Sequence, residues 1–170
     1  MLAILKAVPG SVLWLLSGPE NSDANLRARI AQTGVDPERI VFMPKLPHAE
    51  YLSRYRHADL FLDTAHYNAH TTASDALWAG CPLLTTPGET FAARVAASLN
   101  HHLGMDALNA ANDDAYVGIA SHLGNDPGAR AALRAQLGRS RQDSGFFDMD
   151  GLADDFLSLV QRMVDRQRAG

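Results

Sequence analysis

The groups of this chain best suited to hold a phosphate lie in residues 63–75. This segment leaves an apolar run through a polar loop and enters a helical pattern at two hydroxyl residues, Thr71 and Thr72. The first turn of a helix exposes unpaired backbone N–H groups and the positive end of the helix dipole, and both stabilise a phosphate. The threonine hydroxyls add two donors beside them. The pattern predicts a phosphate site at the turn formed by residues 68–72.

A simpler interpretation of the same residues is a helix cap. Thr72 and Asp75 have the S/T-x-x-D spacing in which the two side chains only satisfy the first turn of a helix. Because caps are common, the spacing alone favours this interpretation. The two interpretations are compatible, since a capped helix start can still face a ligand.

A second polar turn follows the next apolar run, over residues 85–90. Gly88 lets the backbone approach a ligand closely, and Thr90 is expected to start the next helix. Taken alone, this is an ordinary connection between a strand and a helix. Two such turns at the ends of adjacent strands, however, predict a cleft lined with hydrogen-bond donors.

Apolar runs that alternate with helical patterns must position these turns. Strands are predicted over residues 11–16, 39–44, 59–63 and 81–85, and helices over residues 25–34, 47–58, 71–79 and 90–99. Such alternation is typical of right-handed βαβ units, so we expect an α/β fold with a doubly wound parallel sheet and helices on both faces. Ligands bind such sheets at the carboxyl ends of the strands, where both polar turns lie.

Beyond the last strand the chain is predicted to be helical, over about residues 113–123, 127–141 and 151–168. The last of these helices carries a stripe of large apolar side chains. An uncovered stripe of this kind is unstable in water, so we expect this helix either to fold back on its own lobe or to drive self-association.

Composition excludes several classes of partner. The chain has 170 residues, with 15 Lys and Arg against 19 Asp and Glu, which predicts no binding to nucleic acid or to an anionic membrane surface. Its apolar first nine residues are far shorter than the ~20 that a membrane span needs. The single cysteine, Cys81, can form no internal disulfide. We therefore expect a globular protein of the cytoplasm.

Three motifs together resemble the C-terminal catalytic lobe of the O-linked N-acetylglucosamine transferases and SPINDLY-like proteins. They are Asn68–Thr72, Asp75–Gly80, and Pro87–Thr90 with Arg94–Ser98. The likeness covers residues 1–110 well and the helical tail more loosely. It implies the GT-B architecture, in which the active site lies between two Rossmann-like lobes, and a UDP-sugar donor used without a metal ion or other cofactor. Residues 1–110 would be the UDP-sugar-binding lobe, truncated at its start, and residues 111–170 the helices that complete it.

The resemblance also implies a role for particular residues. His70, Thr71 and Thr72 would hold the UDP diphosphate, and Asp75 would accept hydrogen bonds from the ribose hydroxyls. The loop of residues 44–47, including Leu46, would present backbone groups to the uracil, with Arg54 near the base and Asn68 in the donor site. Tyr51 stands where many relatives have a base-stacking histidine, and an aromatic face can still stack on uracil. His48 replaces a family lysine, and His66 could line the sugar pocket.

The activity that the resemblance implies is transfer of a sugar, N-acetylglucosamine, from a UDP-sugar to a Ser or Thr hydroxyl of a protein. The family's phosphate-binding lysine would lie in this lobe, upstream of residue 1. The family's acid/base residues would belong to a missing N-terminal lobe, with helical repeats upstream. No residue of this chain is therefore assigned a proton-transfer role. Two alternatives stay open: a non-catalytic nucleotide-binding or scaffold module, and another UDP-sugar enzyme with the same half-fold.

Overall fold

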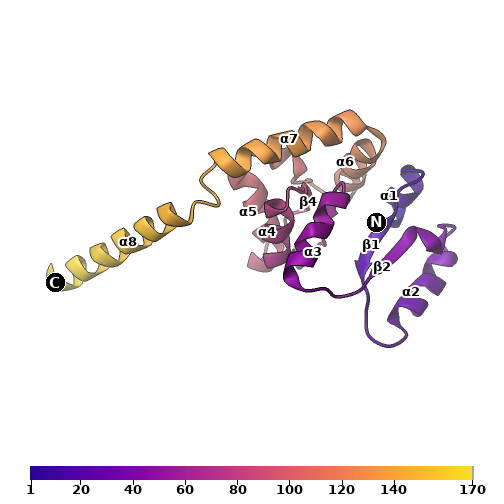
Figure 1. Cartoon of the computed structure of the whole chain (residues 1–170), viewed down its shortest axis with the longest axis horizontal. Coiled ribbons are helices and arrows are strands. Elements are labelled where there is room, and N and C mark those ends of the chain that lie inside the picture. Colours follow the sequence, from indigo (N-terminus) through magenta and orange to yellow (C-terminus); the bar gives the residue numbers. More distant parts are fainter. Residues whose placement is uncertain (170) are drawn as a thin grey trace.

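The computed structural model describes residues 1–169 (Figure 1). Four short strands alternate with helices in the first part of the chain, and the last part is helical. The strands are β1 (Leu13–Leu16), β2 (Ile40–Met43), β3 (Phe61–Leu62) and β4 (Leu83–Leu84). The α-helices are α1 (Leu2–Ala7), α2 (Ser22–Ala31), α3 (His48–Arg54), α4 (Thr71–Trp78), α5 (Val95–His102), α6 (Asp113–Asn125), α7 (Pro127–Asp143) and α8 (Met149–Ala169). Short 3₁₀ turns are η1 (Pro37–Arg39), η2 (Tyr55–His57), η3 (Phe91–Ala93) and η4 (Asp106–Leu108).

The predicted parallel α/β arrangement is confirmed, with one difference in the sheet. The strands pair in parallel as β1 with β2 and as β3 with β4, so they form two two-stranded sheets and not one continuous sheet. Both sheets line one cavity of about 880 Å³. Its lining includes Leu13 and Leu15 of β1, Leu62 of β3 and Leu60, which directly precedes β3. The two sheets do not hydrogen-bond to each other, and an apolar space lies between β1 and β3.

Each sheet has its own hydrophobic core. The smaller core joins α1, α2 and the β1–β2 sheet, and consists of Leu5, Ile30, Val35 and Ile40. The larger core surrounds β3 and β4, and α4 to α7 contribute to it. Its fully buried residues include Leu77, Leu83, Leu84, Leu103 and Leu137. A buried leucine contributes about 1.5–3 kcal/mol relative to an exposed one, so the second sheet and its helices are held as one packed unit.

Cys81 belongs to this larger unit as a core residue. Its side chain is fully buried, and burial raises the pKa of the thiol to about 12. The thiol therefore stays protonated at neutral pH, which makes it a poor nucleophile.

The tail helices begin close to where the sequence predicts, because side-chain caps mark their first turns. The Asn112 side chain accepts a hydrogen bond from the Ala115 amide at 2.9 Å, and Asp126 accepts one from the Ala129 amide at 2.9 Å. The bond from Ala129 also holds the pKa of Asp126 below its ordinary value. Pro127 occupies the first turn of α7, where its missing N–H has no cost.

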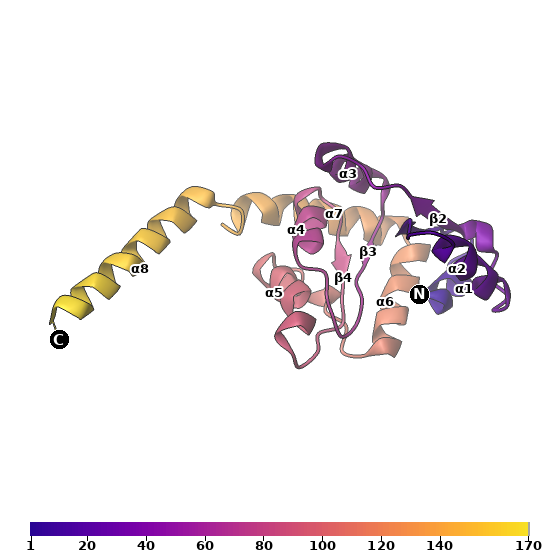
Figure 2. The ribbon, with the colours of Figure 1, turned by 90° about the horizontal axis from the view of Figure 1, so that it is seen from below.

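The last helix, α8, extends away from the rest of the molecule (Figures 1 and 2). The side chains of its apolar stripe are between 40% and 67% exposed: Leu152, Phe156, Leu159, Val160 and Met163. The expectation that this helix folds back on its own lobe is therefore wrong for this structure, and self-association remains a prediction. Within residues 1–169, no helix combines the length and the apolarity needed to cross a bilayer.

Candidate functional site

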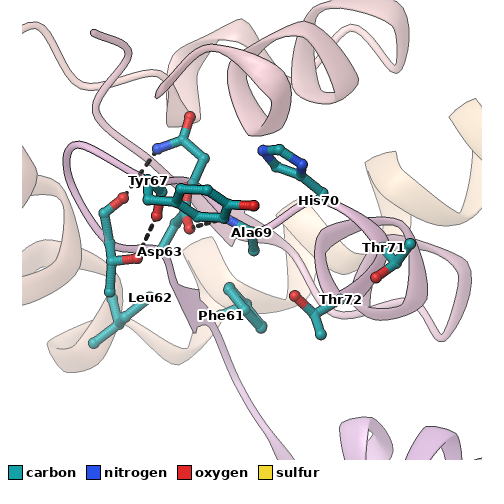
Figure 3. Close-up of a pocket in the computed structure, with 10 residues that line it drawn as sticks. Phe61, Leu62, Asp63, Tyr67, Ala69, His70, Thr71 and Thr72 are labelled. Atoms are coloured by element: carbon teal, nitrogen blue, oxygen red, sulfur yellow. Dashed lines mark hydrogen bonds between the residues drawn. The ribbon is translucent and has the colours of Figure 1, made fainter. Parts of the chain in front are cut away.

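The candidate site is built on Asp63, which directly follows β3. Its side chain is buried, and each carboxylate oxygen accepts one hydrogen bond. Thr85 Oγ1 donates to Oδ2 at 2.7 Å. The Ala69 amide donates to Oδ1 at 2.7 Å, as Figure 3 shows. The Tyr116 hydroxyl of α6 donates to the Asp63 carbonyl at 2.8 Å. Asp63 thus connects the ends of β3 and β4, helix α6 and the residue before His70.

Asn68 fixes the turn from inside. Its side chain is 1% exposed, and its Nδ2 donates to the Thr64 carbonyl at 3.0 Å. Its backbone amide donates to the Ala92 carbonyl at 2.8 Å, which joins this turn to the second polar turn. The Oδ1 atom is buried and has no hydrogen-bond partner among the described residues. The hydrogen bonds of Asn68 thus hold the turn and join it to η3, and Asn68 also lines the cavity described below.

Helix α4 begins at Thr71, as predicted, but without the predicted cap. His70 is the N-cap residue and makes no side-chain cap hydrogen bond, and its carbonyl accepts from the Ala73 and Ser74 amides at 3.1 Å each. The Thr72–Asp75 capping interpretation is therefore wrong. Asp75 Oδ1 lies instead 3.4 Å from His48 Nε2, at the start of α3. In residues 1–169 neither Thr71 nor Thr72 uses its hydroxyl in a hydrogen bond, and both side chains are exposed.

A cavity of about 430 Å³ lies between the turn and the start of α4. Figure 3 shows its lining side chains, which come from the end of β3, the loop after it and the first residues of α4. They are Phe61, Leu62, Asp63, Thr64, Tyr67, Asn68, Ala69, His70, Thr71 and Thr72. The cavity thus lies at the carboxyl end of a parallel strand and faces the amino end of a helix, as expected for a phosphate site.

The predicted base-side residues lie around the adjoining, larger cavity. Leu46, Tyr51 and Arg54 line the space of about 880 Å³, which shares Thr64 and Thr72 with the smaller cavity. Every residue that the sequence assigned to the site therefore lines one of two adjoining cavities, with the exceptions of Asp75 and His66. Asp75 reaches them indirectly, through its contact with His48, which also lines the larger cavity.

Helix α3 arranges the base side through its own contacts. The Arg54 guanidinium donates to the Pro44 carbonyl at 2.8 Å and so holds the loop that precedes the helix. The Tyr51 and Tyr55 hydroxyls hydrogen-bond to each other, and burial raises the pKa of both phenols. Both hydroxyls stay protonated at neutral pH as a result. The Tyr51 ring stacks on the His48 imidazole at 6.1 Å between centroids.

The second polar turn supports the first and lies outside the smaller cavity. The Gly88 amide donates to the Ala93 carbonyl at 2.7 Å, and a Cβ at position 88 would lie 2.7 Å from the Ala93 Cβ. Gly88 is therefore required by the close approach of its own turn. Thr90 starts the next helical turn, as expected, because its hydroxyl accepts from the Ala93 amide at 3.3 Å.

Tyr67, and not His66, lines the smaller cavity. His66 has a positive φ of 69° and an exposed side chain, which places it on the outer side of the turn. Sequence reasoning missed the roles of Tyr67 and Asp63. For Asp63 the sequence did contain a signal, namely a carboxylate directly after an apolar run. A carboxylate at such a position is buried only when hydrogen bonds satisfy it. For Tyr67 no periodicity in the loop indicates the side on which the ring lies.

Most of the chain matches the model of a known protein family. Residues 1–156 match the family model described as glycosyl transferase family 41. The chain belongs to this family. The sequence resemblance described above is thereby confirmed.

Individual family 41 relatives support the assignment. The chain is 38% identical over 169 residues to a UDP-N-acetylglucosamine–peptide N-acetylglucosaminyltransferase of Caenorhabditis elegans, covering 99% of this chain and 15% of that protein. It is 38% identical over 146 residues to the probable enzyme SEC of Arabidopsis thaliana, covering 85% of this chain and 15% of the relative. This family 41 chain thus spans about a sixth of the length of these relatives.

A solved structure of the same kind confirms the fold. A mutant O-GlcNAc transferase of Thermobaculum terrenum superposes with a TM-score of 0.85 at 30% sequence identity. The match covers 95% of the family 41 chain studied here and 32% of the solved chain. The predicted assignment to a lobe of the GT-B fold is therefore confirmed.

The role of Asp63 predicts a large effect of mutation on stability. Asp63→Ala should lower the free energy of unfolding by about 3–5 kcal/mol, because two charge-assisted hydrogen bonds are lost and the Ala69 amide is left without an acceptor. Thr85→Val is the matched variant and should cost only about 1–3 kcal/mol, since it removes one of the two bonds. Equilibrium denaturation in urea measures both variants. Equal, small losses would show that Asp63 does not organise the turn.

Proposed function

We propose that this chain is the donor-binding part of an enzyme that transfers N-acetylglucosamine from a UDP-sugar to a Ser or Thr hydroxyl of a protein. The observation that carries the proposal is the pair of exposed hydroxyls of Thr71 and Thr72 at the start of α4. They face a cavity that shares lining residues with a larger cavity beside it, which Tyr51 lines. The relatives named above are transferases that use UDP-N-acetylglucosamine and a peptide.

The diphosphate would bind at the start of α4. The backbone N–H groups of the first turn, the helix dipole and the two threonine hydroxyls all place positive potential in the smaller cavity. Negative charge develops on the diphosphate when the sugar leaves it, so donors fixed in advance stabilise the transition state more than the ground state. This stabilisation requires no metal ion. His70 would add its imidazole beside the same oxygens.

The nucleoside would occupy the larger cavity. Tyr51 offers an aromatic face to uracil, and the loop that Arg54 holds through Pro44 offers backbone groups, including those of Leu46, to the base edge. Asp75 would accept hydrogen bonds from the ribose hydroxyls through Oδ2, because Oδ1 faces His48. Asn68 would not bind the donor through its amide group but would hold the turn in the shape that the donor site needs.

The acid/base chemistry would come from the remainder of a longer protein. Its partners would then be the UDP-sugar, an acceptor protein and the N-terminal lobe that completes the cleft. A cytoplasmic setting suits a chain whose single cysteine is a buried thiol.

Replacing Thr72 tests the diphosphate site. Thr72→Val keeps the side-chain volume but removes the hydroxyl, and a lost hydrogen bond to a charged group costs about 1.5–3 kcal/mol. The dissociation constant for UDP should therefore rise about tenfold or more in calorimetry. Thr33→Val, in the turn after α2, is the matched control and should leave UDP binding unchanged. An unchanged constant in Thr72→Val would contradict a role in phosphate binding, and equal affinities of the wild-type chain for UDP, GDP and ADP would contradict base recognition.

The purified chain should lack transferase activity by itself, because no acid/base group is assigned to it. Incubation with radiolabelled UDP-N-acetylglucosamine and a protein acceptor should give no incorporation above background, while the C. elegans relative serves as the positive control. Sustained turnover would place the proton-transfer group in this chain. His66 and His70 would then be the first residues to replace.

A further inference from the structure

Helix α8 carries an apolar face that no other part of residues 1–169 covers. The helix extends away from the rest of the molecule, so this face meets water (Figures 1 and 2). Its large apolar side chains recur alternately every three and four residues, which is the heptad spacing by which two helices pack side by side. We call the five of them the α8 seam: Met149, Leu152, Phe156, Leu159 and Met163.

The charges on α8 differ in sign between its two halves. The first half holds only acidic residues, and the second half has a net positive charge: Asp150, Asp154 and Asp155, then Arg162, Asp165, Arg166 and Arg168. The helix dipole favours such a pattern, but only within the first and last turns. Asp155 and Arg162 lie more than a turn inside the helix, so the dipole does not account for them. Neither forms an ion pair within residues 1–169.

An antiparallel second copy of α8 fits the α8 seam. Phe156 of each copy would lie against Leu159 of the other, and Leu152 would lie against Met163. Each lobe precedes its own α8, so the two lobes would lie at opposite ends of the helix pair (Figure 1). A parallel pair would bring both lobes to the same end. The room that the lobes need thus favours the antiparallel pair.

The same alignment pairs the inner charges. Asp155 and Arg162 each directly precede a residue of the α8 seam, so both side chains flank the seam on the same side. In the antiparallel pair Asp155 of each copy faces Arg162 of the other, and the two-fold symmetry makes this contact twice. In a parallel pair Asp155 would face Val160, and Arg162 would face Gln167. Only the antiparallel orientation matches opposite charges.

We propose that α8 binds α8 of a second copy of this chain in antiparallel orientation and so forms a two-fold symmetric dimer. Burial of the α8 seam drives the association. The two contacts between Asp155 and Arg162 select the orientation. The inference is independent of donor binding, because no residue of α8 lines either cavity.

Sedimentation velocity of the full chain should show a reversible equilibrium that moves from monomer to dimer as the concentration rises. Phe156→Ser should raise the dimer dissociation constant about a hundredfold or more, because symmetry removes two large apolar side chains from the interface. Leu157→Ser is the matched control. Leu157 is 64% exposed, against 63% for Phe156, but it lies about 100° further round the helix, off the α8 seam. This control should change the constant by no more than about threefold.

Reversing the inner charges tests the orientation. Asp155→Arg alone and Arg162→Asp alone should each raise the dissociation constant about tenfold, since each brings like charges together at both contacts. The double variant restores opposite charges across the pair and should return the constant to within about threefold of the wild-type value. A helix that had simply unfolded in the single variants would not recover in this way.

Cysteine cross-linking gives a second measure of orientation. Cys81 is fully buried, so a new thiol on α8 reports alone. A mixture of Leu152→Cys and Met163→Cys chains should form disulfide-linked dimers under mild oxidation. Leu152→Cys chains by themselves should form few, because the antiparallel pair separates the two copies of position 152 by about 17 Å.

Two sets of results would contradict the proposal. A monomer at every concentration, or equal losses in Phe156→Ser and Leu157→Ser, would overturn the dimer. A dimer in which the double charge reversal gives no rescue and Leu152→Cys cross-links to itself would be parallel, and would overturn the orientation. Either outcome leaves the proposed donor site untouched.

Discussion

The burial of the Asp63 carboxylate is the constraint on which the site depends. Removing a charge from water costs several kcal/mol unless hydrogen bonds replace the lost hydration. In this chain Thr85 and the Ala69 amide supply them, at 2.7 Å each. Both donors must stay where they are for Asp63 to remain buried, so the end of β4 and the turn before α4 are held in one geometry. Tyr116 of α6 adds a third link through the Asp63 carbonyl.

A turn fixed by the core would allow a short helix to serve as the proposed phosphate site. α4 has eight residues and its helix dipole acts only near its first turn, so the donors must already face the ligand. The turn presents Thr71 and Thr72 to one cavity, and α3 presents Tyr51 and Arg54 to the adjoining one. The proposed separation between a phosphate end and a base end would follow from the start of α3 lying beside α4, where His48 is 3.4 Å from Asp75.

Local patterns in the sequence predicted local structure well. The apolar runs located all four strands, and the helical patterns located the tail helices, two of which the structure caps at Asn112 and Asp126. Choices between distant partners were not predictable. Asp75 contacts His48 and not Thr72, His66 turns outward through a positive φ, and the strands divide into two sheets. The Asp75 contact and the strand pairing depend on which distant residues meet, and spacing along the chain does not contain that information.

The central claim is that the start of α4 holds the diphosphate of the donor. A crystal structure of this chain with UDP tests it most directly. The account predicts both phosphates in the smaller cavity, with oxygens within hydrogen-bond distance of the Thr71 and Thr72 hydroxyls and the first-turn amides of α4, and uracil against Tyr51. Phosphates bound elsewhere, for example at the second polar turn around Gly88, with Thr71 and Thr72 still facing water, would contradict it.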